Sequence, residues 1–321
     1  MAAEIYVVSG FLGAGKTTLI QKLLREAFSQ KKVVLIENDF GEISVDAALL
    51  KSGSIEVKEL NSGCICCSLA GDFVRALQEL LERFHPDIII IEPSGVGRLS
   101  DIIKACLDPR ILPLAEVKAK ITVVDVKRCQ MYLDNFGEFF EDQIEKADVI
   151  LLSRTGNFPG KVNDAYEMVK NLNGHAVTFS KPWEQIKAAE IIAPGSEPGG
   201  CTDHCGLPGC GCENHDEHGL GHDCHCHPVN LAEDIFDTIT IRTKRVFSIE
   251  ELEMRVLNME RQAKGTILRA KGIVRGVDGY INLQYLPGDI CITNCAAHGD
   301  MVCIIGRNLN RQELCTLLGG E

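Results

Sequence analysis

Residues 10–17 read Gly10-Phe11-Leu12-Gly13-Ala14-Gly15-Lys16-Thr17, a complete match to the phosphate-loop pattern G-x-x-x-x-G-K-T. The stretch follows a strongly apolar run at 5–9 and opens a helical pattern at 17–29, which is the context that such a loop requires. Backbone N–H groups of the loop and the N-terminus of the helix together bind phosphate. Lys16 is predicted to bind the β- and γ-phosphate oxygens, and Thr17 to bind Mg²⁺. The predicted nucleotide-binding residues of this stretch are Gly10, Gly13, Ala14, Gly15, Lys16, Thr17 and Thr18.

Short runs rich in Ile and Val alternate with longer amphipathic stretches through residues 1–180. This alternation predicts an α/β domain, and the near-continuous hydrophobicity of the runs predicts a mainly parallel sheet covered on both faces. We therefore predict a doubly wound P-loop NTPase domain over 1–192. Its expected strands are 5–9, 33–37, 88–92, 121–125 and 149–152, and its expected helices are 17–29, 69–84, 137–147 and 161–172.

Two of the expected strands end in an acidic residue. Glu92 ends an isoleucine run and is followed by Pro93-Ser94-Gly95. Ligands gather at the carboxyl ends of parallel strands, so Glu92 is predicted to reach Mg²⁺ through water. Gly95 is predicted to offer its backbone N–H to the γ-phosphate. Asp125 ends another strand and is equally consistent with a phosphate-site role and with a structural role.

The composition changes abruptly after the first domain, to Gly, Pro, Cys, His and Asp. This change predicts a linker over 193–232 that has no regular structure until metal binds. Beyond it, strand and helix patterns separated by Gly and Pro predict a smaller α+β domain with an antiparallel sheet over 233–321. Its expected strands are 235–241, 266–274, 280–285, 290–294 and 301–305, and its expected helices are 248–264, capped by Ser248 and Glu251, and 311–318.

The chain has fifteen cysteines, and their distribution indicates reduced thiols that bind metal. Three of them lie in Cys64-Ile65-Cys66-Cys67, directly before a predicted helix whose N-terminus favours the thiolate form. Soft thiolates bind Zn²⁺ and other late transition metals in preference to Mg²⁺. Cys64 and Cys67 also form a C-x-x-C pair, so a redox dithiol is an alternative.

The linker holds a second group of metal-binding side chains. Its excess of ligands and its Gly-rich spacing predict a flexible metal collector, because no single four-ligand spacing emerges. No subset of these ligands can be chosen from the sequence. The candidate ligands are Cys201, His204, Cys205, Cys210, Cys212, His215, His218, His222, Cys224, His225, Cys226 and His227.

Composition argues against several other classes of protein. The formal net charge is −12, which disfavours a protein whose main task is binding nucleic acid. No run of about eighteen apolar residues is present, so a membrane span is not expected. The N-terminus lacks the basic and apolar regions of an export signal. We therefore expect a cytoplasmic protein with no nucleic-acid partner and no membrane partner.

Four segments resemble, in order and spacing, the CobW family of P-loop metallochaperone GTPases. They are the phosphate loop, Glu37-Asn38-Asp39-Phe40-Gly41-Glu42, Gly63-Cys64-Ile65-Cys66-Cys67 and Ile91-Glu92-Pro93-Ser94-Gly95. Residues 266–272 also resemble the L-R-x-K-G signature of that family's C-terminal domain.

The resemblance implies roles for several of these residues. Glu37, Cys66 and Cys67 would form or border an internal transition-metal site, to which the cysteine motif adds Cys64. Glu42 would belong to a switch region facing the nucleotide, where we place it with Lys16 and Glu92 as catalytic.

One segment departs from the family pattern. Where the family reads guanine with N-K-x-D, this chain has Ser153-Arg154-Thr155-Gly156. Gly156 cannot supply the carboxylate that accepts hydrogen bonds from guanine N1 and N2, a group worth about 1–3 kcal/mol. Arg154 can still stack on a base, so Ser153 and Arg154 are kept as nucleotide-binding residues. GTP is favoured on resemblance, and ATP stays open.

These features predict an NTP hydrolase with Mg²⁺ as cofactor and Zn²⁺ or Co²⁺ as cargo. The resemblance to the CobW family implies, as partner, a client metalloprotein or a protein of the cobalamin pathway. Two alternatives stay open: a metal buffer with weak hydrolysis, and a redox switch that uses Cys64 and Cys67. The oligomeric state, a homo-oligomer included, is left open by the sequence.

Overall fold

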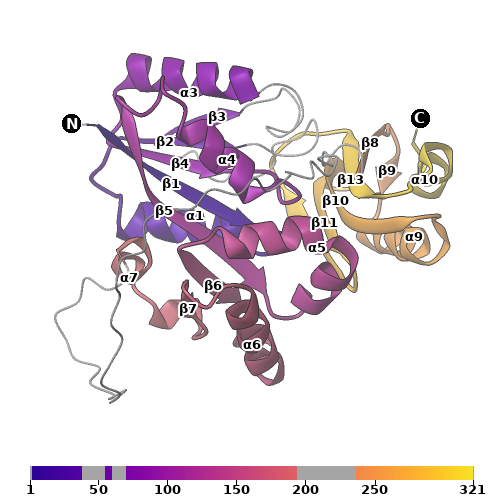
Figure 1. The fold of residues 1–321 in the computed structure, drawn as a ribbon. Helices are drawn as coiled ribbons and strands as arrows, with labels where there is room; N and C mark the ends of the chain where they lie inside the picture. The colour runs from indigo at the N-terminus through magenta and orange to yellow at the C-terminus, as the bar shows by residue number, and fades with distance from the viewer. Residues whose placement is uncertain (1, 38–54, 60–69, 194–235, 321) are drawn as a thin grey trace, which may run out of the picture.

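The computed structural model describes residues 2–37, 55–59, 70–193 and 236–320. The predicted switch residue Glu42, the Cys64–Cys67 motif and the His/Cys-rich linker lie outside the described residues. The described residues form two units, each built on its own sheet; the second is drawn in orange and yellow in Figure 1.

The first unit contains a seven-stranded sheet whose strand pairings are all parallel. The strand order is β3-β2-β4-β1-β5-β6-β7, so β1, which leads into the phosphate loop, lies at the centre. This arrangement confirms the predicted α/β class. The strands are β1 (Ala3–Gly10), β2 (Val33–Glu37), β3 (Ile55–Glu59), β4 (Ile88–Glu92), β5 (Ala115–Asp125), β6 (Val149–Ser153) and β7 (Val177–Phe179). The helices are α1 (Lys16–Glu26), α3 (Ala70–Phe84), α4 (Leu99–Cys106), α5 (Cys129–Glu145), α6 (Val162–Leu172) and α7 (Ala188–Ile192), with short 3₁₀ turns at Pro159–Lys161 and Trp183–Gln185.

Alternate residues of the central strand fill two separate cores. Ile5 and Val7 belong to the core covered by α3, α4, α5 and α6, whereas Tyr6 and Val8 belong to the core covered by α1 and α7. Because both faces of the sheet are buried, each strand needs apolar side chains at successive positions. This is the physical reason for the near-continuous Ile/Val runs of the sequence.

The second unit is a smaller sheet with antiparallel order β12-β11-β10-β13-β8, to which the short β9 adds by a parallel pairing with β10. Two helices pack together on it. This confirms the predicted α+β class of the second half. The elements are β8 (Asp237–Arg242), β9 (Val246–Phe247), α9 (Ile249–Gln262), β10 (Thr266–Gly276), β11 (Gly279–Leu286), β12 (Asp289–Cys295), β13 (Met301–Arg307) and α10 (Arg311–Leu318).

The two units share one apolar cluster. The ring centroid of Phe236, at the start of the second unit, lies 5.3 Å from that of Phe136 and 5.4 Å from that of Phe139, both on α5. Leu268 and Ile305, from β10 and β13, belong to the same cluster. The second unit is therefore joined to the first by buried side chains and not only through the chain.

Several boundaries differ from the expected ones. Strand β5 begins at Ala115 instead of 121, because its first half alternates buried and exposed positions and lacks a continuous apolar run. Helix α5 begins at Cys129 instead of 137; it continues through a kink at Phe136, whose φ and ψ are −140° and 31°. Ser248 caps α9 as predicted, accepting from the N–H of Glu251, but the Glu251 carboxylate accepts from Arg245 and Arg255.

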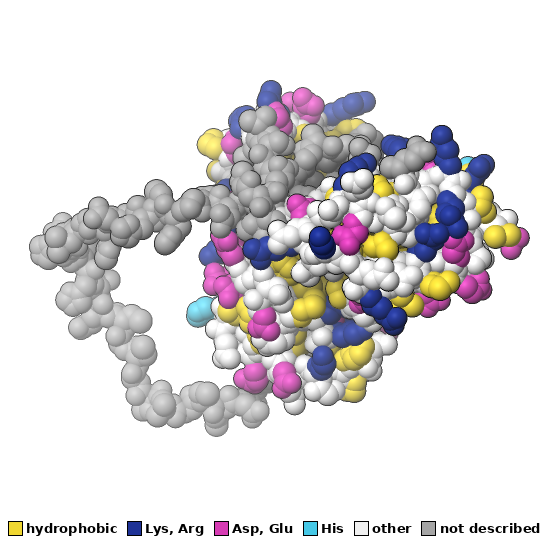
Figure 2. Space-filling view, turned by 90° about the vertical axis from the view of Figure 1, so that its right-hand side faces the viewer, with side chains coloured by type: hydrophobic (Ala, Val, Ile, Leu, Met, Phe, Trp, Pro, Cys, Tyr) yellow, Lys and Arg dark blue, Asp and Glu magenta, His cyan; other side chains and the backbone are white. Residues whose placement is uncertain are grey.

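The surface of the second unit carries charges of both signs. On the face shown in Figure 2, Lys and Arg side chains are interspersed with Asp and Glu side chains. Within the described ranges, none of the helices combines the length and the hydropathy that a membrane span requires.

Candidate nucleotide and metal site

The phosphate loop joins β1 to α1, and α1 begins at Lys16. Gly13 has a φ of +67°, a left-handed conformation that favours glycine. The buried Lys16 folds back over the loop, and its Nζ donates to the carbonyl oxygen of Gly10 at 3.0 Å. The ammonium group is thus held above the loop whose backbone N–H groups would receive phosphate.

Thr17 and Glu92 come together at the adjacent strand end. Glu92 ends β4, the neighbour of β1 in the sheet, and its Oε1 lies 3.4 Å from Thr17 Oγ1. Hydroxyl and carboxylate oxygens are hard donors of the kind that Mg²⁺ prefers. The chemistry of this pair fits the predicted Mg²⁺ position.

Glu37 lies one strand further along the same edge. In the parallel register of β2 and β4, Glu37 stands directly beside Glu92. Its side chain is buried, with 6% exposed. Lys271, on β10 of the second unit, interacts electrostatically with Glu37. Burial lowers the pKa of Lys271 to about 8, while the interactions with Cys303 and Glu37 act to raise it. Glu37 is therefore close to both the nucleotide edge and the second unit.

Gly95 is packed against the phosphate loop. A Cβ at this position would lie 2.9 Å from the backbone nitrogen of Leu12, so any larger residue would push the two segments apart. The buried side chain of Gln143, on α5, donates to the carbonyl oxygens of Gly95 and Gly97 at 3.2 and 2.8 Å. The turn predicted to sense the γ-phosphate is fixed beside the loop by these contacts.

A pocket of about 340 Å³ opens next to the loop. Its walls are residues 13–15 of the phosphate loop, Thr18 of α1, the turn 153–157 after β6 and the turn 182–184 after β7. Predicted residues Ser153 and Arg154 both line it. A cavity that extends from a phosphate loop along the next strand ends has the place and size for a nucleoside.

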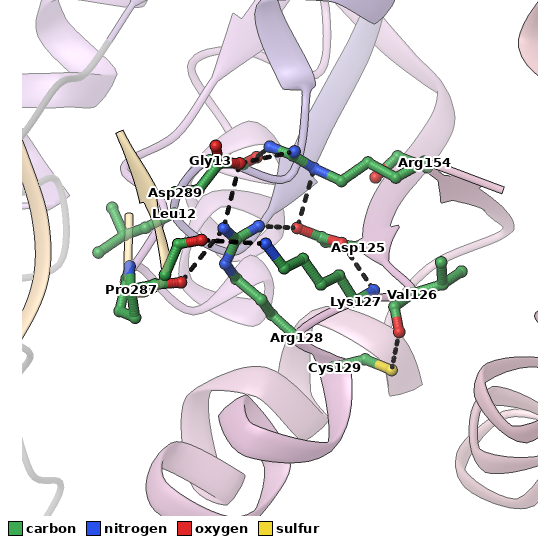
Figure 3. A network of polar contacts seen from close by, with 12 residues as sticks. Leu12, Gly13, Asp125, Val126, Lys127, Arg128, Cys129, Arg154, Pro287 and Asp289 are labelled. Atoms are coloured by element: carbon green, nitrogen blue, oxygen red, sulfur yellow. Dashed lines mark hydrogen bonds and ion pairs between the residues drawn. The ribbon is translucent and has the colours of Figure 1, made fainter. Parts of the chain in front are cut away.

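Arg154 is held by a network of charges (Figure 3). It has a φ of +61°, its Nε lies 3.1 Å from Asp125 Oδ2, and its Nη1 lies 3.1 Å from Asp289 Oδ2. Arg128 binds the same two carboxylates, at 2.8 Å and 3.3 Å. Asp125 is 0% exposed at its side chain and is occupied by both guanidinium groups. Of its two predicted roles, these contacts fit the structural one.

The second unit touches the phosphate loop through the tip between β11 and β12. A Cβ on Gly13 would lie 2.3 Å from Leu286 Cδ1, so Leu286 sits directly on the loop. Lys127 donates to the carbonyl of Gly288 at 3.3 Å, and Arg128 to that of Pro287 at 3.3 Å. The tip, residues 286–289, therefore contacts the phosphate loop, the β5–α5 turn and Arg154 at once.

The structure brings together the predicted residues of the first unit that it describes; Glu42 and the cysteine motif lie outside the described residues. No group of three or more His, Cys, Asp or Glu side chains placed to hold a metal occurs within the described ranges. Trp183 and Glu184 are among the pocket residues that the sequence reasoning missed. The sequence offered no local signal for them, because β7, the strand that precedes their turn, is only three residues long.

Comparison with known proteins adds two family matches. The description "CobW/HypB/UreG, nucleotide-binding domain" matches residues 4–180, and "Cobalamin synthesis protein cobW C-terminal domain" matches residues 236–320. The two matches coincide with the two sheets.

Individual relatives match over part of their length. The zinc chaperone CobW of a Sinorhizobium species is 39% identical over 177 residues, which cover 46% of this chain and 50% of that protein. The zinc chaperone YjiA of Escherichia coli (strain K12) is 31% identical over 182 residues, covering 55% of this chain and 56% of that protein. The chain thus spans about half the length of the curated relatives it matches. The crystal structure of Zn(II)-bound YjiA GTPase from E. coli aligns with 99% of this chain and 98% of that chain at 16% identity and a TM-score of 0.43.

Proposed function

This chain belongs to the CobW/HypB/UreG family of P-loop GTPases, and from that premise we propose that it is a nucleotide-hydrolysing metallochaperone that carries zinc. In this proposal, GTP is the favoured nucleotide and Mg²⁺ its companion ion. The cargo passes to a client metalloprotein. Several curated relatives are themselves called zinc chaperones, which favours Zn²⁺ over Co²⁺ as the cargo.

One observation carries the proposal: Glu37 and Glu92 are register partners on adjacent parallel strands. Glu37 is the described member of the expected transition-metal site, and Glu92 contacts Thr17 at the expected Mg²⁺ position. A movement of either strand end would therefore displace the other strand end as well. Two ligands that bias one such element have coupled affinities.

The phosphate chemistry would be carried by residues of the first unit. Lys16 would stabilise negative charge on the β- and γ-phosphates, and Gly95 would offer its N–H to the γ-phosphate from its fixed place beside the loop. Thr17 and Glu92 would hold Mg²⁺, which, when bound, neutralises charge that develops on the transferred group. We assign Glu42, outside the described residues, to positioning the attacking water.

The cargo would be held by Glu37 with Cys66 and Cys67, and Cys64 of the same motif would be a further ligand. Thiolates with one carboxylate make a donor set that suits Zn²⁺. The His/Cys-rich linker at 193–232 would collect metal and pass it to this site. Hydrolysis would then change the geometry of the strand end that carries Glu37 and release the metal.

The test is steady-state hydrolysis of GTP and of ATP by metal-stripped protein, with and without Zn²⁺ or Co²⁺. We expect turnover to change with Zn²⁺, and the affinity for Zn²⁺ to change with nucleotide by the same factor as the affinity for nucleotide changes with Zn²⁺. Glu37→Ala should remove this coupling, while Glu79→Ala, an exposed residue on α3, should leave it intact.

Three outcomes would contradict the proposal. Turnover and metal affinity that are independent of each other would separate the two sites. Metal binding without measurable turnover would make the chain a metal buffer. A reversible disulfide between Cys64 and Cys67 without metal uptake would make it a redox switch.

A further inference from the structure

Glu184 is a pocket residue to which the proposed chemistry gives no role. It is the one acidic side chain among the described residues that line the nucleoside pocket. The side chain is exposed, and no ion pair ties it to another described residue. Its carboxylate is therefore solvated and available to a ligand that enters the pocket.

The position of Glu184 is fixed by its neighbour Trp183. The indole Nε1 of Trp183 donates to the carbonyl of Leu152, near the end of β6, at 2.9 Å. The indole ring also reaches the phosphate loop, 3.3 Å from where a Cβ on Gly15 would lie. The N–H of Ile186 donates to the Trp183 carbonyl at 3.2 Å, which closes the 3₁₀ turn around Glu184. The carboxylate is thus carried by a turn anchored to both walls of the pocket.

The other polar groups of the pocket do not offer a second carboxylate. Gly156 has no side chain, and a Cβ built on it meets nothing within 4 Å, so this part of the wall is open. Arg154 is already bound by Asp125 and Asp289. Ser153 donates to the carbonyl of Val124 at 3.4 Å. Glu184 is left as the anionic acceptor among the described lining residues.

A carboxylate distinguishes the two purine bases. Guanine presents N1–H and the 2-amino group side by side, and the two oxygens of one carboxylate can accept from both. Adenine presents the lone pair of N1 at the same place, which a carboxylate can only repel. Hydrogen bonds to a charged group of this kind are worth about tenfold to a hundredfold in affinity.

We propose that Glu184 selects guanine over adenine in this pocket by accepting hydrogen bonds from guanine N1–H and N2–H. The inference rests on the proposed nucleotide-binding function and names the residue that gives it a guanine substrate. It places base selection after β7, on the turn that Trp183 anchors, and not after β6.

The experiment is calorimetric titration of the full chain with GDP, ADP and xanthosine diphosphate in the presence of Mg²⁺. Diphosphates are used because their binding requires neither turnover nor cargo metal. The test variant is Glu184→Gln, which keeps the size of an exposed side chain. Glu167→Gln, an exposed position on α6 that does not line the pocket, is the matched control.

We expect the unaltered chain to bind GDP at least tenfold more tightly than ADP. Glu184→Gln should weaken GDP about tenfold or more and leave ADP within about twofold. It should also tighten xanthosine diphosphate, because a glutamine amide can donate to the 2-carbonyl of xanthine while accepting from N1–H. The control should change none of the three affinities.

Three results would overturn the inference. They are an unaltered chain without a preference for GDP, a GDP/ADP ratio that Glu184→Gln leaves unchanged, and an equal loss of GDP and ADP. Failure of the metallochaperone proposal is distinguishable from these, since it would appear as hydrolysis indifferent to Zn²⁺ while the GDP/ADP ratio still followed Glu184.

Discussion

Single glycines in and beside the phosphate loop are constrained by their backbone conformation or by the close approach of another segment. Gly13 must adopt a left-handed backbone and at the same time leave room for Leu286 of the second unit. Gly95 must allow the turn after β4 to touch the backbone of Leu12. Glycine allows close approach at both positions, and at Gly13 it also allows the left-handed backbone, so neither position has room for a side chain.

Gly13→Ala should therefore damage the loop and the contact with the second unit together. The new methyl group would overlap Leu286 Cδ1, at 2.3 Å, on a backbone with φ of +67°. We expect a loss of at least about 1 kcal/mol in unfolding free energy and at least tenfold weaker nucleotide binding. Urea denaturation and titration calorimetry measure both. Gly160→Ala, where a Cβ meets nothing within 4 Å, is the control and should be nearly neutral.

Gly156→Asp tests the open wall of the nucleoside pocket. Its φ is not in the left-handed region and its Cβ would meet nothing within 4 Å, so aspartate fits without strain. Introduced into the Glu184→Gln variant, it should restore a preference for GDP over ADP of about tenfold. The affinity ratio from titration calorimetry checks it. A ratio that stays at the level of the Glu184→Gln parent would mean that this wall does not face the base.

How far residues could be predicted depended on the range of the contacts involved. Lys16, Thr17 and Glu92 follow local patterns, and the structure brings them together. Trp183 and Glu184 reach the pocket only because β7 lies beside β6, and a three-residue strand is too short for its periodicity to be seen. The contact of Leu286 with Gly13 joins positions far apart in the chain and has no local signal at all.

At the scale of elements, the tip between β11 and β12 connects the second unit to the nucleotide pocket through polar contacts. Asp289, the first residue of β12, binds both Arg128 and Arg154, and Glu260 of α9 accepts from the N–H of Gly288 at 3.0 Å. The tip is thus held from its own unit on one side and from the nucleotide pocket on the other.

Asp289 should make this contact sensitive to acid. Its burial acts to raise its pKa, but the hydrogen bond from Arg128 and the charges of Arg128, Arg154 and Lys127 together outweigh burial, and the pKa is lowered. A carboxylate with a lowered folded-state pKa contributes stability above its unfolded pKa of about 3.9, and that contribution is lost as pH falls through the folded value. Asp289→Asn should therefore be less stable than the unaltered chain near pH 6, and the difference should shrink below about pH 4.

Urea denaturation at a series of pH values measures the Asp289 effect. The control is Asp278→Asn, an exposed carboxylate on the turn between β10 and β11. A stability difference for Asp289→Asn that is constant from pH 6 to pH 3 would show that the charge of Asp289 does not contribute.

Helices and strands could be predicted from the sequence where one hydrophobic pattern covered the whole segment. Val33–Glu37, Ile88–Glu92 and Arg311–Leu318 are observed as expected, because their burial is uniform or strictly periodic. The start of α5 was missed because its two halves meet at the Phe136 kink, which interrupts the helical period. Helix α4 was also missed, and strand β7 was missed because it has only three residues.

At the scale of the whole molecule, the apolar cluster that both units share couples the folding of the two units. Phe236, with 2% exposed, packs between the rings of α5 and joins residues of β10 and β13 to the first core. Units that share a buried cluster lose part of each core when they separate. We therefore expect the chain to unfold with strong coupling between its two sheets.

Phe236→Ala should weaken that coupling. Removing a buried phenylalanine side chain costs about 3–5 kcal/mol, here from a cluster that both units share. The expected result is that a single calorimetric transition broadens or divides into two. Phe247→Ala, equally buried but inside the second core alone, should lower stability without dividing the transition. A Phe236→Ala transition that stays single and unshifted would contradict the shared core.

The place of Trp183 has a practical consequence. The chain has one tryptophan, and its indole lies between the end of β6 and the phosphate loop, 3.3 Å from where a Gly15 Cβ would be. All ultraviolet emission of indole character from this protein therefore comes from one chromophore at the wall of the nucleoside pocket. A nucleotide that enters would replace water beside the indole ring with its base or ribose. This would change the wavelength and the intensity of the tryptophan fluorescence. The native chain is its own optical probe, and rapid mixing could time the arrival and departure of a nucleotide without any label.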